Sequence, residues 1–121
     1  PFLVRSLERT GVSAIIIEDK VGTKRNSLFK DQINTKQDKP QTFAKKILKI
    51  CNSRQSPDFL VIARIESFIV GKDLNDALKR AEIYSRAGAD AILIHSKEKT
   101  PAEVFSFARE FRKSKYYKPL V

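Results

Sequence analysis

The sequence predicts an α/β fold built from parallel β/α units. Three short, apolar runs suit strands buried on both faces: Ala14 to Ile17, Phe59 to Ala63 and Ala91 to Ile94. Segments with helical spacing alternate with these runs, which indicates parallel strands joined by helices. Such units form an open doubly wound sheet or part of a (β/α)8 barrel. A complete barrel takes about 250 residues, so 121 residues with about four strands would supply half of one.

The first two helices are predicted from apolar spacing and from residues that stop or start helices. Leu3 to Arg9 reads as the end of a helix that stops at Gly11. The next helix opens at Pro40, and its Phe43, Ile47 and Cys51 fall at positions i, i+4 and i+8 on one face. Between the first strand and this helix lie about twenty polar residues, 20–39. A loop of that length is usually functional or disordered.

Two further helices carry clearer end signals. One runs from Asp73, a predicted N-cap, to Gly88, which suits a left-handed C-terminal stop. The other begins with Thr100, Pro101 and Glu103, which match an N-cap, a first-position proline and a capping-box acid. Residues 119–121 then start another strand, so the whole chain reads as one domain of repeated β/α units.

Composition narrows the class of protein. The 24 Lys and Arg exceed the 14 Asp and Glu, for a formal charge of +10. These basic residues divide evenly between residues 1–60 and 61–121, without a basic block, so we expect no nucleic-acid partner. We also expect no membrane contact and a cytoplasmic protein, because the chain has neither a long apolar run nor a signal-peptide pattern. The absence of methionine suggests part of a longer chain.

Charged and polar side chains gather where the predicted strands end. They are Glu18, Asp19 and Lys20 after the first strand, Arg64 and Glu66 at the second, and His95 and Ser96 after the third. Any one of them could be an ordinary structural ion pair. The carboxyl ends of parallel strands meet at one edge of a sheet, however, and ligands bind there in this class of fold. We therefore expect a binding site at this edge.

The residue types at this edge suggest which ligand it takes. Carboxylates can hold a hard cation such as Mg²⁺, while Arg64 can grip a carboxylate or phosphate with two parallel hydrogen bonds and His95 can add another. A small phosphorylated or carboxylated molecule is therefore favoured over a polymer. The four glycines lie far apart, which excludes the glycine-rich nucleotide-binding patterns.

Five motifs along the chain are distinctive: E-D-K-V-G-T-K-R-N-S-L-F (18–29), A-R-I-E-S (63–67), A-L-K-R-A-E (77–82), A-G-A-D-A-I-L-I-H-S-K (87–97) and P-A-E-V-F (101–105). Together they resemble the phosphoenolpyruvate mutases, which are magnesium-dependent TIM-type barrels of the isocitrate lyase superfamily. The resemblance covers essentially the whole chain. The isocitrate and methylisocitrate lyases carry a K-x-C-G-H type loop, whereas this chain has Lys24, Arg25, Asn26 and Ser27 there, so lyase chemistry is disfavoured.

The resemblance implies interconversion of phosphoenolpyruvate and phosphonopyruvate, the step that opens phosphonate biosynthesis. Carried over by residue, it makes Glu18 an anchor of the magnesium shell. It gives catalytic and substrate-binding roles to Lys24, Asn26, Arg64 and His95, substrate-binding roles to Ser27 and Leu28, and supporting roles to Glu66 and Ser96.

The resemblance also implies what these 121 residues lack. The family's catalytic aspartate and paired magnesium aspartates lie on earlier strands, so we expect the chain alone to be inactive and its longer parent to form a homo-oligomer. Two other interpretations stay open. One is phosphonopyruvate hydrolase, which shares the same strand ends, and the other is a non-catalytic fragment that binds anions or a protein partner.

Overall fold

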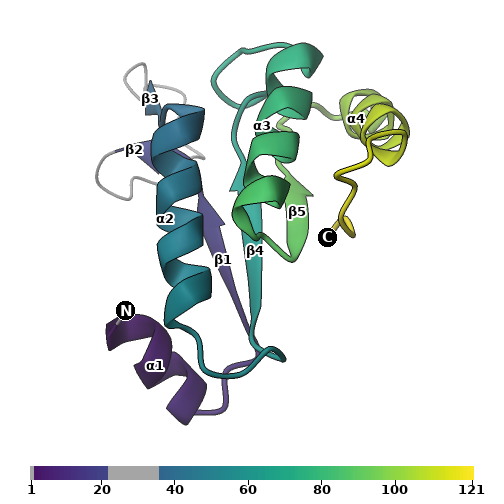
Figure 1. Cartoon of the computed structure of the whole chain (residues 1–121). Coiled ribbons are helices and arrows are strands. Elements are labelled where there is room, and N and C mark those ends of the chain that lie inside the picture. Colours follow the sequence, from purple (N-terminus) through teal and green to yellow (C-terminus); the bar gives the residue numbers. More distant parts are fainter. Residues whose placement is uncertain (1, 22–35) are drawn as a thin grey trace.

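A computed structural model describes residues 2–21 and 36–121 of the chain. Its main sheet contains β1 (Ala14–Glu18), β4 (Leu60–Ile65) and β5 (Ala91–Ile94), in that order and all parallel. The helices are α1 (Phe2–Arg9), α2 (Pro40–Ser53), α3 (Leu74–Ala87) and α4 (Ala102–Arg112), and two short strands, β2 (Lys20–Val21) and β3 (Lys36–Gln37), form an antiparallel pair (Figure 1). The predicted α/β class with parallel β/α units is confirmed.

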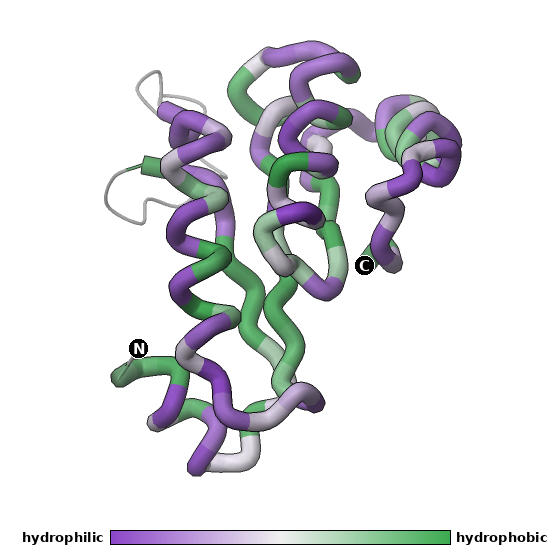
Figure 2. Tube along the Cα trace, viewed as in Figure 1, coloured by the Kyte–Doolittle hydropathy of each residue, from purple (hydrophilic) through white to green (hydrophobic). Residues whose placement is uncertain are grey.

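The helices α2 and α3 lie side by side over one face of the sheet (Figure 1). The core forms where apolar side chains of β4 and β5 meet these helices, and Phe107 and Phe111 of α4 extend it. Figure 2 shows why: β1 and β4 are apolar over most of their length, up to Glu18 and Arg64 near their ends, whereas the helices alternate apolar and polar residues. Buried members of this core include Phe43, Ile47, Ala63, Ile65, Ala77, Ala81, Tyr84 and Ile92.

The opposite face of the sheet carries less cover within the described residues. Ile16 in the middle of β1 is 52% exposed, and Leu60 at the start of β4 is 42% exposed. Both are strand residues with apolar side chains, and strand side chains alternate between faces. A (β/α) barrel buries such a face inside the closed sheet, so the exposure agrees with the prediction of a partial barrel.

Two element boundaries differ from the sequence prediction. β4 continues to Ile65, two residues beyond the apolar run, so Arg64 lies inside the strand. The predicted capping box of α4 is wrong: Pro101 is the N-cap residue and makes no side-chain cap hydrogen bond. The Glu103 carboxylate instead accepts a hydrogen bond from the Ser96 hydroxyl at 2.6 Å. Glu103 therefore binds Ser96 and does not act as the acid of a capping box.

The start of α2 at Pro40 and both ends of α3 are confirmed, whereas the segment 20–39, predicted as one loop, carries β2 and β3 at its ends. The Asp73 side chain accepts from the Asp76 N–H at the start of α3, and Gly88 adopts the left-handed conformation at its end. The predicted last strand is present as a single parallel bridge between Ile92 and Leu120. Within the described residues, none of the helices has the length and apolar character needed to cross a membrane.

Replacement of Gly88 should destabilise the fold through two effects. Its φ of +117° is strained for any residue with a Cβ, and a Cβ would lie 3.2 Å from Cys51 Sγ. Gly71, with φ of +81° and open space around it, is the matched control for the first effect alone. We expect Gly88→Ala to lower the free energy of unfolding by about 1 kcal/mol more than Gly71→Ala. Urea denaturation of both variants measures this, and equal losses would contradict it.

Candidate active site at the carboxyl ends of the strands

The structure brings together side chains from the ends of all three main strands. Glu18 ends β1 and is aligned with Arg64 of β4, while Glu66 and His95 directly follow β4 and β5. Ala63 and Ile65 belong to the core beneath α2 and α3. Because strand side chains alternate, Arg64 points to the opposite face, the one that a barrel turns inward. Four of the predicted residues, Glu18, Arg64, Glu66 and His95, therefore meet at this edge, whereas Asp19 and Ser96 turn away from it.

Arg64 is the centre of this cluster. Its Nε lies 2.5 Å from Glu66 Oε1, an ion pair that lacks the alignment of a hydrogen bond, and its Nη2 lies 3.6 Å from Glu18 Oε2. The Glu66 carboxylate is fully buried, whereas about a third of the Glu18, Arg64 and His95 side chains stays exposed. The cluster thus places a buried carboxylate beneath three partly exposed side chains, among which Arg64 can hold an anion and Glu18 offers carboxylate oxygens.

His95 contacts both charged neighbours through the same ring nitrogen. Its Nδ1 lies 2.7 Å from Arg64 Nη2 and 3.1 Å from Glu66 Oε2. A guanidinium only donates, so the tautomer that accepts from Arg64 at Nδ1 carries its proton on Nε2. The other tautomer donates from Nδ1 to Glu66. In the first of these tautomers, His95 can donate through Nε2 to a ligand.

The remaining predicted site residues divide into two groups. Ser96 turns toward α4, where its hydroxyl donates to Glu103. Lys24, Asn26, Ser27 and Leu28 lie outside the described residues. Among the described residues, no group of three His, Cys, Asp or Glu side chains is placed to hold a metal ion.

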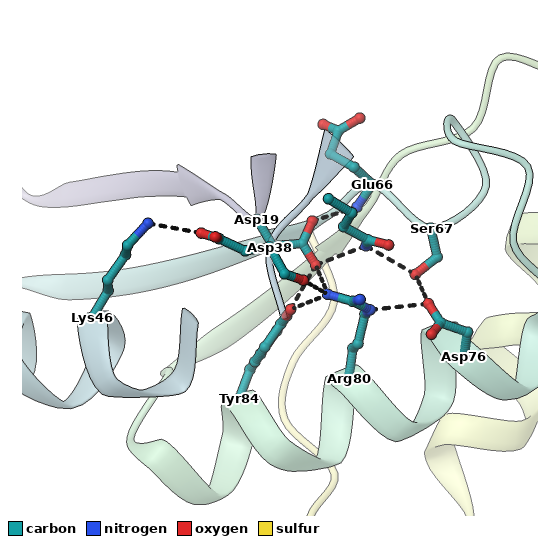
Figure 3. Close-up of polar contacts among 9 residues, drawn as sticks. Asp19, Asp38, Lys46, Glu66, Ser67, Asp76, Arg80 and Tyr84 are labelled. Carbon is teal, nitrogen blue, oxygen red and sulfur yellow. Dashed lines mark hydrogen bonds and ion pairs between the residues drawn. The ribbon is translucent and has the colours of Figure 1, made fainter. Parts of the chain in front are cut away.

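A buried polar network lies on the other side of the strand ends and was not predicted (Figure 3). Asp19, fully buried, accepts from Tyr84 Oη at 2.6 Å, Gln37 Nε2 at 2.8 Å and Arg80 Nη1 at 3.3 Å. Arg80 also donates to Asp76 and to the Asp38 carbonyl. The sequence contains one usable signal: Asp76, Arg80 and Tyr84 fall four residues apart and share one face of α3.

Burial and polar contacts shift the pKa of Asp19 in opposite directions. Burial raises the pKa of the Asp19 carboxyl, while the hydrogen bonds from Tyr84 and the Glu66 N–H and the charge of Arg80 pull it back down. Burial also raises the pKa of the Tyr84 hydroxyl, and the Asp19 carboxylate raises it further. Tyr84 is therefore held as a neutral donor.

The raised pKa of Tyr84 predicts a loss of stability at high pH. Above about pH 10 the unfolded chain releases the phenol proton while the folded protein keeps it. The unfolded state then binds fewer protons, so stability falls as pH rises. Between pH 10 and 11 the free energy of unfolding should drop by up to about 1.4 kcal/mol more in the wild type than in Tyr84→Phe. Urea denaturation across this range measures the difference, and identical slopes would contradict it.

Comparison with known proteins identifies relatives of this chain. The family model described as "Phosphoenolpyruvate phosphomutase" matches residues 1–121. The phosphoenolpyruvate phosphomutase of Tetrahymena pyriformis is 45% identical over 111 residues, which cover 91% of this chain and 36% of that protein. The phosphonopyruvate hydrolase of Variovorax sp. (strain Pal2) is 40% identical over 110 residues, which cover 91% of this chain and 38% of that protein.

Solved structures give the same result. A phosphoenolpyruvate phosphomutase from Streptomyces platensis subsp. rosaceus superposes with a TM-score of 0.87 at 38% identity, covering 98% of this chain and 40% of that one. A phosphonopyruvate hydrolase in complex with oxalate and Mg²⁺ superposes with a TM-score of 0.81 at 36% identity, covering 98% of this chain and 38% of that one. The chain thus spans less than half the length of these relatives. By its sequence over residues 1–121, the chain belongs to the phosphoenolpyruvate phosphomutase family.

Proposed function

We propose that the full-length protein containing this chain is a magnesium-dependent phosphoenolpyruvate mutase. It would interconvert phosphoenolpyruvate and 3-phosphonopyruvate, moving the phosphoryl group between oxygen and carbon in phosphonate biosynthesis. The observation that carries the proposal is the Arg64–Glu66–His95 cluster at the strand ends, in which Arg64 and His95 stay partly exposed above the buried Glu66 carboxylate. Proteins named phosphoenolpyruvate phosphomutase, which are similar to this chain in sequence and in fold, support the same proposal.

Arg64 and His95 would act on the substrate directly. Transfer of a loose, metaphosphate-like group requires positioning and charge neutralisation more than covalent chemistry. Arg64 can hold carboxylate or phosphoryl oxygens with two parallel hydrogen bonds. His95 would donate from Nε2 to the migrating group, because Nδ1 is occupied by Arg64 and Glu66. Glu66 would orient both of these side chains.

Glu18 would help anchor Mg²⁺, most simply through a bound water. Its partly exposed carboxylate is a hard oxygen donor, and Mg²⁺ is typically held by one or two carboxylates together with waters and substrate oxygens. The ion would supply charge neutralisation for the phosphoryl group. The described residues offer one such anchor, so we expect the other ligands to come from the substrate, water and residues outside them.

The proposal keeps the other predicted roles. Lys24, Asn26, Ser27 and Leu28 would bind substrate, with Lys24 and Asn26 also catalytic, and these roles rest on the motif resemblance. Ser96 would support His95 from the adjacent position. We expect residues 1–121 alone to be inactive and the full-length protein to be a cytoplasmic homo-oligomer acting on a small molecule.

Phosphorus NMR of the full-length protein, supplied with phosphonopyruvate and Mg²⁺, tests the function. A phosphate-ester resonance from phosphoenolpyruvate would support the mutase. Inorganic phosphate without that ester would instead support phosphonopyruvate hydrolase, the second candidate, which the 40% identity to such an enzyme favours. An unchanged phosphonate resonance, with or without Mg²⁺, would refute both and leave a non-catalytic binding protein.

A further inference from the structure

The junction around Asp19 differs from an ordinary parallel ladder. The Asp19 N–H donates to the Arg64 carbonyl at 3.1 Å, as the β1–β4 ladder requires. The next ladder bond would run from the Glu66 N–H to the Asp19 carbonyl. Instead, the Glu66 N–H donates to Asp19 Oδ1 at 2.9 Å, and the Asp19 carbonyl accepts from the Asp38 N–H at 2.8 Å. The Asp19 carboxylate thus replaces the Asp19 carbonyl as the acceptor of the last hydrogen bond between β1 and β4.

This replacement ties three elements to one carboxylate. Oδ1 holds the backbone of Glu66 at the end of β4, and Oδ2 accepts from Tyr84 and Arg80 of α3 and from Gln37 of β3. Figure 3 shows the Glu66 carboxylate pointing away from this network while its backbone faces it. Glu66 therefore links the buried network to the candidate active site on the opposite face.

We propose that Asp19 is a positioning residue of the active site: its carboxylate, oriented by Tyr84 and Arg80, fixes the Glu66 backbone and thereby the Arg64–His95 pair. Glu66 contacts both members of that pair, at 2.5 Å from Arg64 Nε and 3.1 Å from His95 Nδ1. A shift of the Glu66 backbone moves the shared carboxylate, and misplacement by about 1 Å can cost about a hundredfold in rate. The inference rests on the proposed mutase function.

The test is a double-mutant cycle in the full-length protein, with kcat/KM for phosphonopyruvate as the readout. Asp19→Asn keeps the size of the side chain but places an amide where Tyr84, Arg80 and Gln37 donate. We expect Asp19→Asn and Glu66→Gln each to lower kcat/KM about 50-fold. Because Asp19 acts through Glu66, the kcat/KM of the double variant should lie within about threefold of the lower of the two single-variant values. A double variant whose loss in kcat/KM equals the product of the two single losses would overturn the inference.

Asp90→Asn is the matched control. Like Asp19, the Asp90 carboxylate accepts hydrogen bonds from a strand N–H, that of Val61 at 2.9 Å, and from an arginine, Arg54. Unlike Asp19, Asp90 lies at the amino ends of the strands. Asp90→Asn should lower the melting temperature while kcat/KM stays within about twofold of the wild type. An equal catalytic loss from this variant would assign a merely structural role to Asp19. If Asp19→Asn does not fold, Tyr84→Phe takes its place in the cycle, with the same expected coupling to Glu66→Gln.

A second readout does not depend on turnover. The ¹⁵N signals of the His95 ring report its hydrogen-bond partners, and a His95→Asn variant assigns them. We expect the chemical shifts of these signals to change in Asp19→Asn or Tyr84→Phe and to stay the same in Asp90→Asn. If the wild type converts no phosphonopyruvate, the proposed function fails by itself, and unshifted His95 signals would then overturn the positioning role separately.

Discussion

Arg64→Lys in the full-length protein should lower kcat/KM for phosphonopyruvate at least about 100-fold, although the charge is kept. Lysine is a single point charge on a flexible chain and cannot form two parallel hydrogen bonds to one anion. Arg64 also contacts Glu66 through Nε, and both Glu18 and His95 through Nη2. An ammonium group cannot span these three directions, so the variant should lose the arrangement of its neighbours together with its own contact.

Steady-state kinetics of Arg64→Lys and Arg112→Lys measure this effect against a matched control. Arg112 is an exposed residue in the last turn of α4, far in sequence from the strand ends. Its replacement by lysine should leave kcat/KM within about twofold of the wild type. Similar losses in the two variants would count against the assignment of the site to Arg64.

The convergence of the strand ends could be predicted because parallel β/α units impose it. Apolar runs located β1, β4 and β5, and parallel pairing then placed Glu18, Arg64 and His95 at one edge. The pattern could not fix how far β4 extends. Its apolar run stops at Ala63, but the ladder continues through Arg64 to Ile65, because backbone pairing with β5 does not depend on an apolar side chain.

The sequence indicates only the α3 part of the buried network, because the contacts of Asp19 join residues far apart in sequence. Tyr84 and Asp19 are 65 positions apart, and Arg80 and Asp19 are 61 apart. Glu18 and Asp19 are adjacent carboxylates that the sequence does not distinguish. The alternation of strand side chains separates them, so that Glu18 faces Arg64 while Asp19 faces α3. Glu18 therefore lies in the candidate site, while Asp19 lies in the buried network behind it.

Two further carboxylates near the strand ends, among the residues that the structure describes, lie in the buried network and not on the open face. Asp38 and Asp76 sit in the buried network, where they pair with Lys46 and Arg80. Both carboxylates are thus committed to structure. This leaves Glu18 as the partly exposed acid that ends β1 and supports the expectation that the remaining magnesium ligands lie outside the described residues.

Arg80→Met should be the most destabilising single change in the buried network, with a loss of about 3–5 kcal/mol in the free energy of unfolding. Arg80 is 3% exposed and faces Asp19, which is fully buried, so its removal leaves a carboxylate in the core without its cation. It also leaves the Asp38 carbonyl without the donor that lies 2.6 Å away. Urea denaturation at neutral pH measures the loss.

The Lys113→Met variant tests whether burial, rather than the mere presence of an ion pair, sets this cost. Lys113 pairs with Glu110 at 3.1 Å on the surface of α4, with the two side chains 68% and 42% exposed. Exposed pairs contribute about 0–1 kcal/mol, so Lys113→Met should change the free energy of unfolding by no more than that. A loss from Arg80→Met as small as that from Lys113→Met would contradict the role of Arg80 as the counter-ion of Asp19.

A double variant separates the uncompensated charge from the lost packing of the Arg80 side chain. If the cost of Arg80→Met arises from the buried charge of Asp19, then adding Asp19→Asn should restore about 1–2 kcal/mol, since the amide carries no charge to desolvate. If the cost arises from packing, the two losses should add. Recovery of stability in the double variant would therefore identify Arg80 as the counter-ion that compensates the buried charge of Asp19.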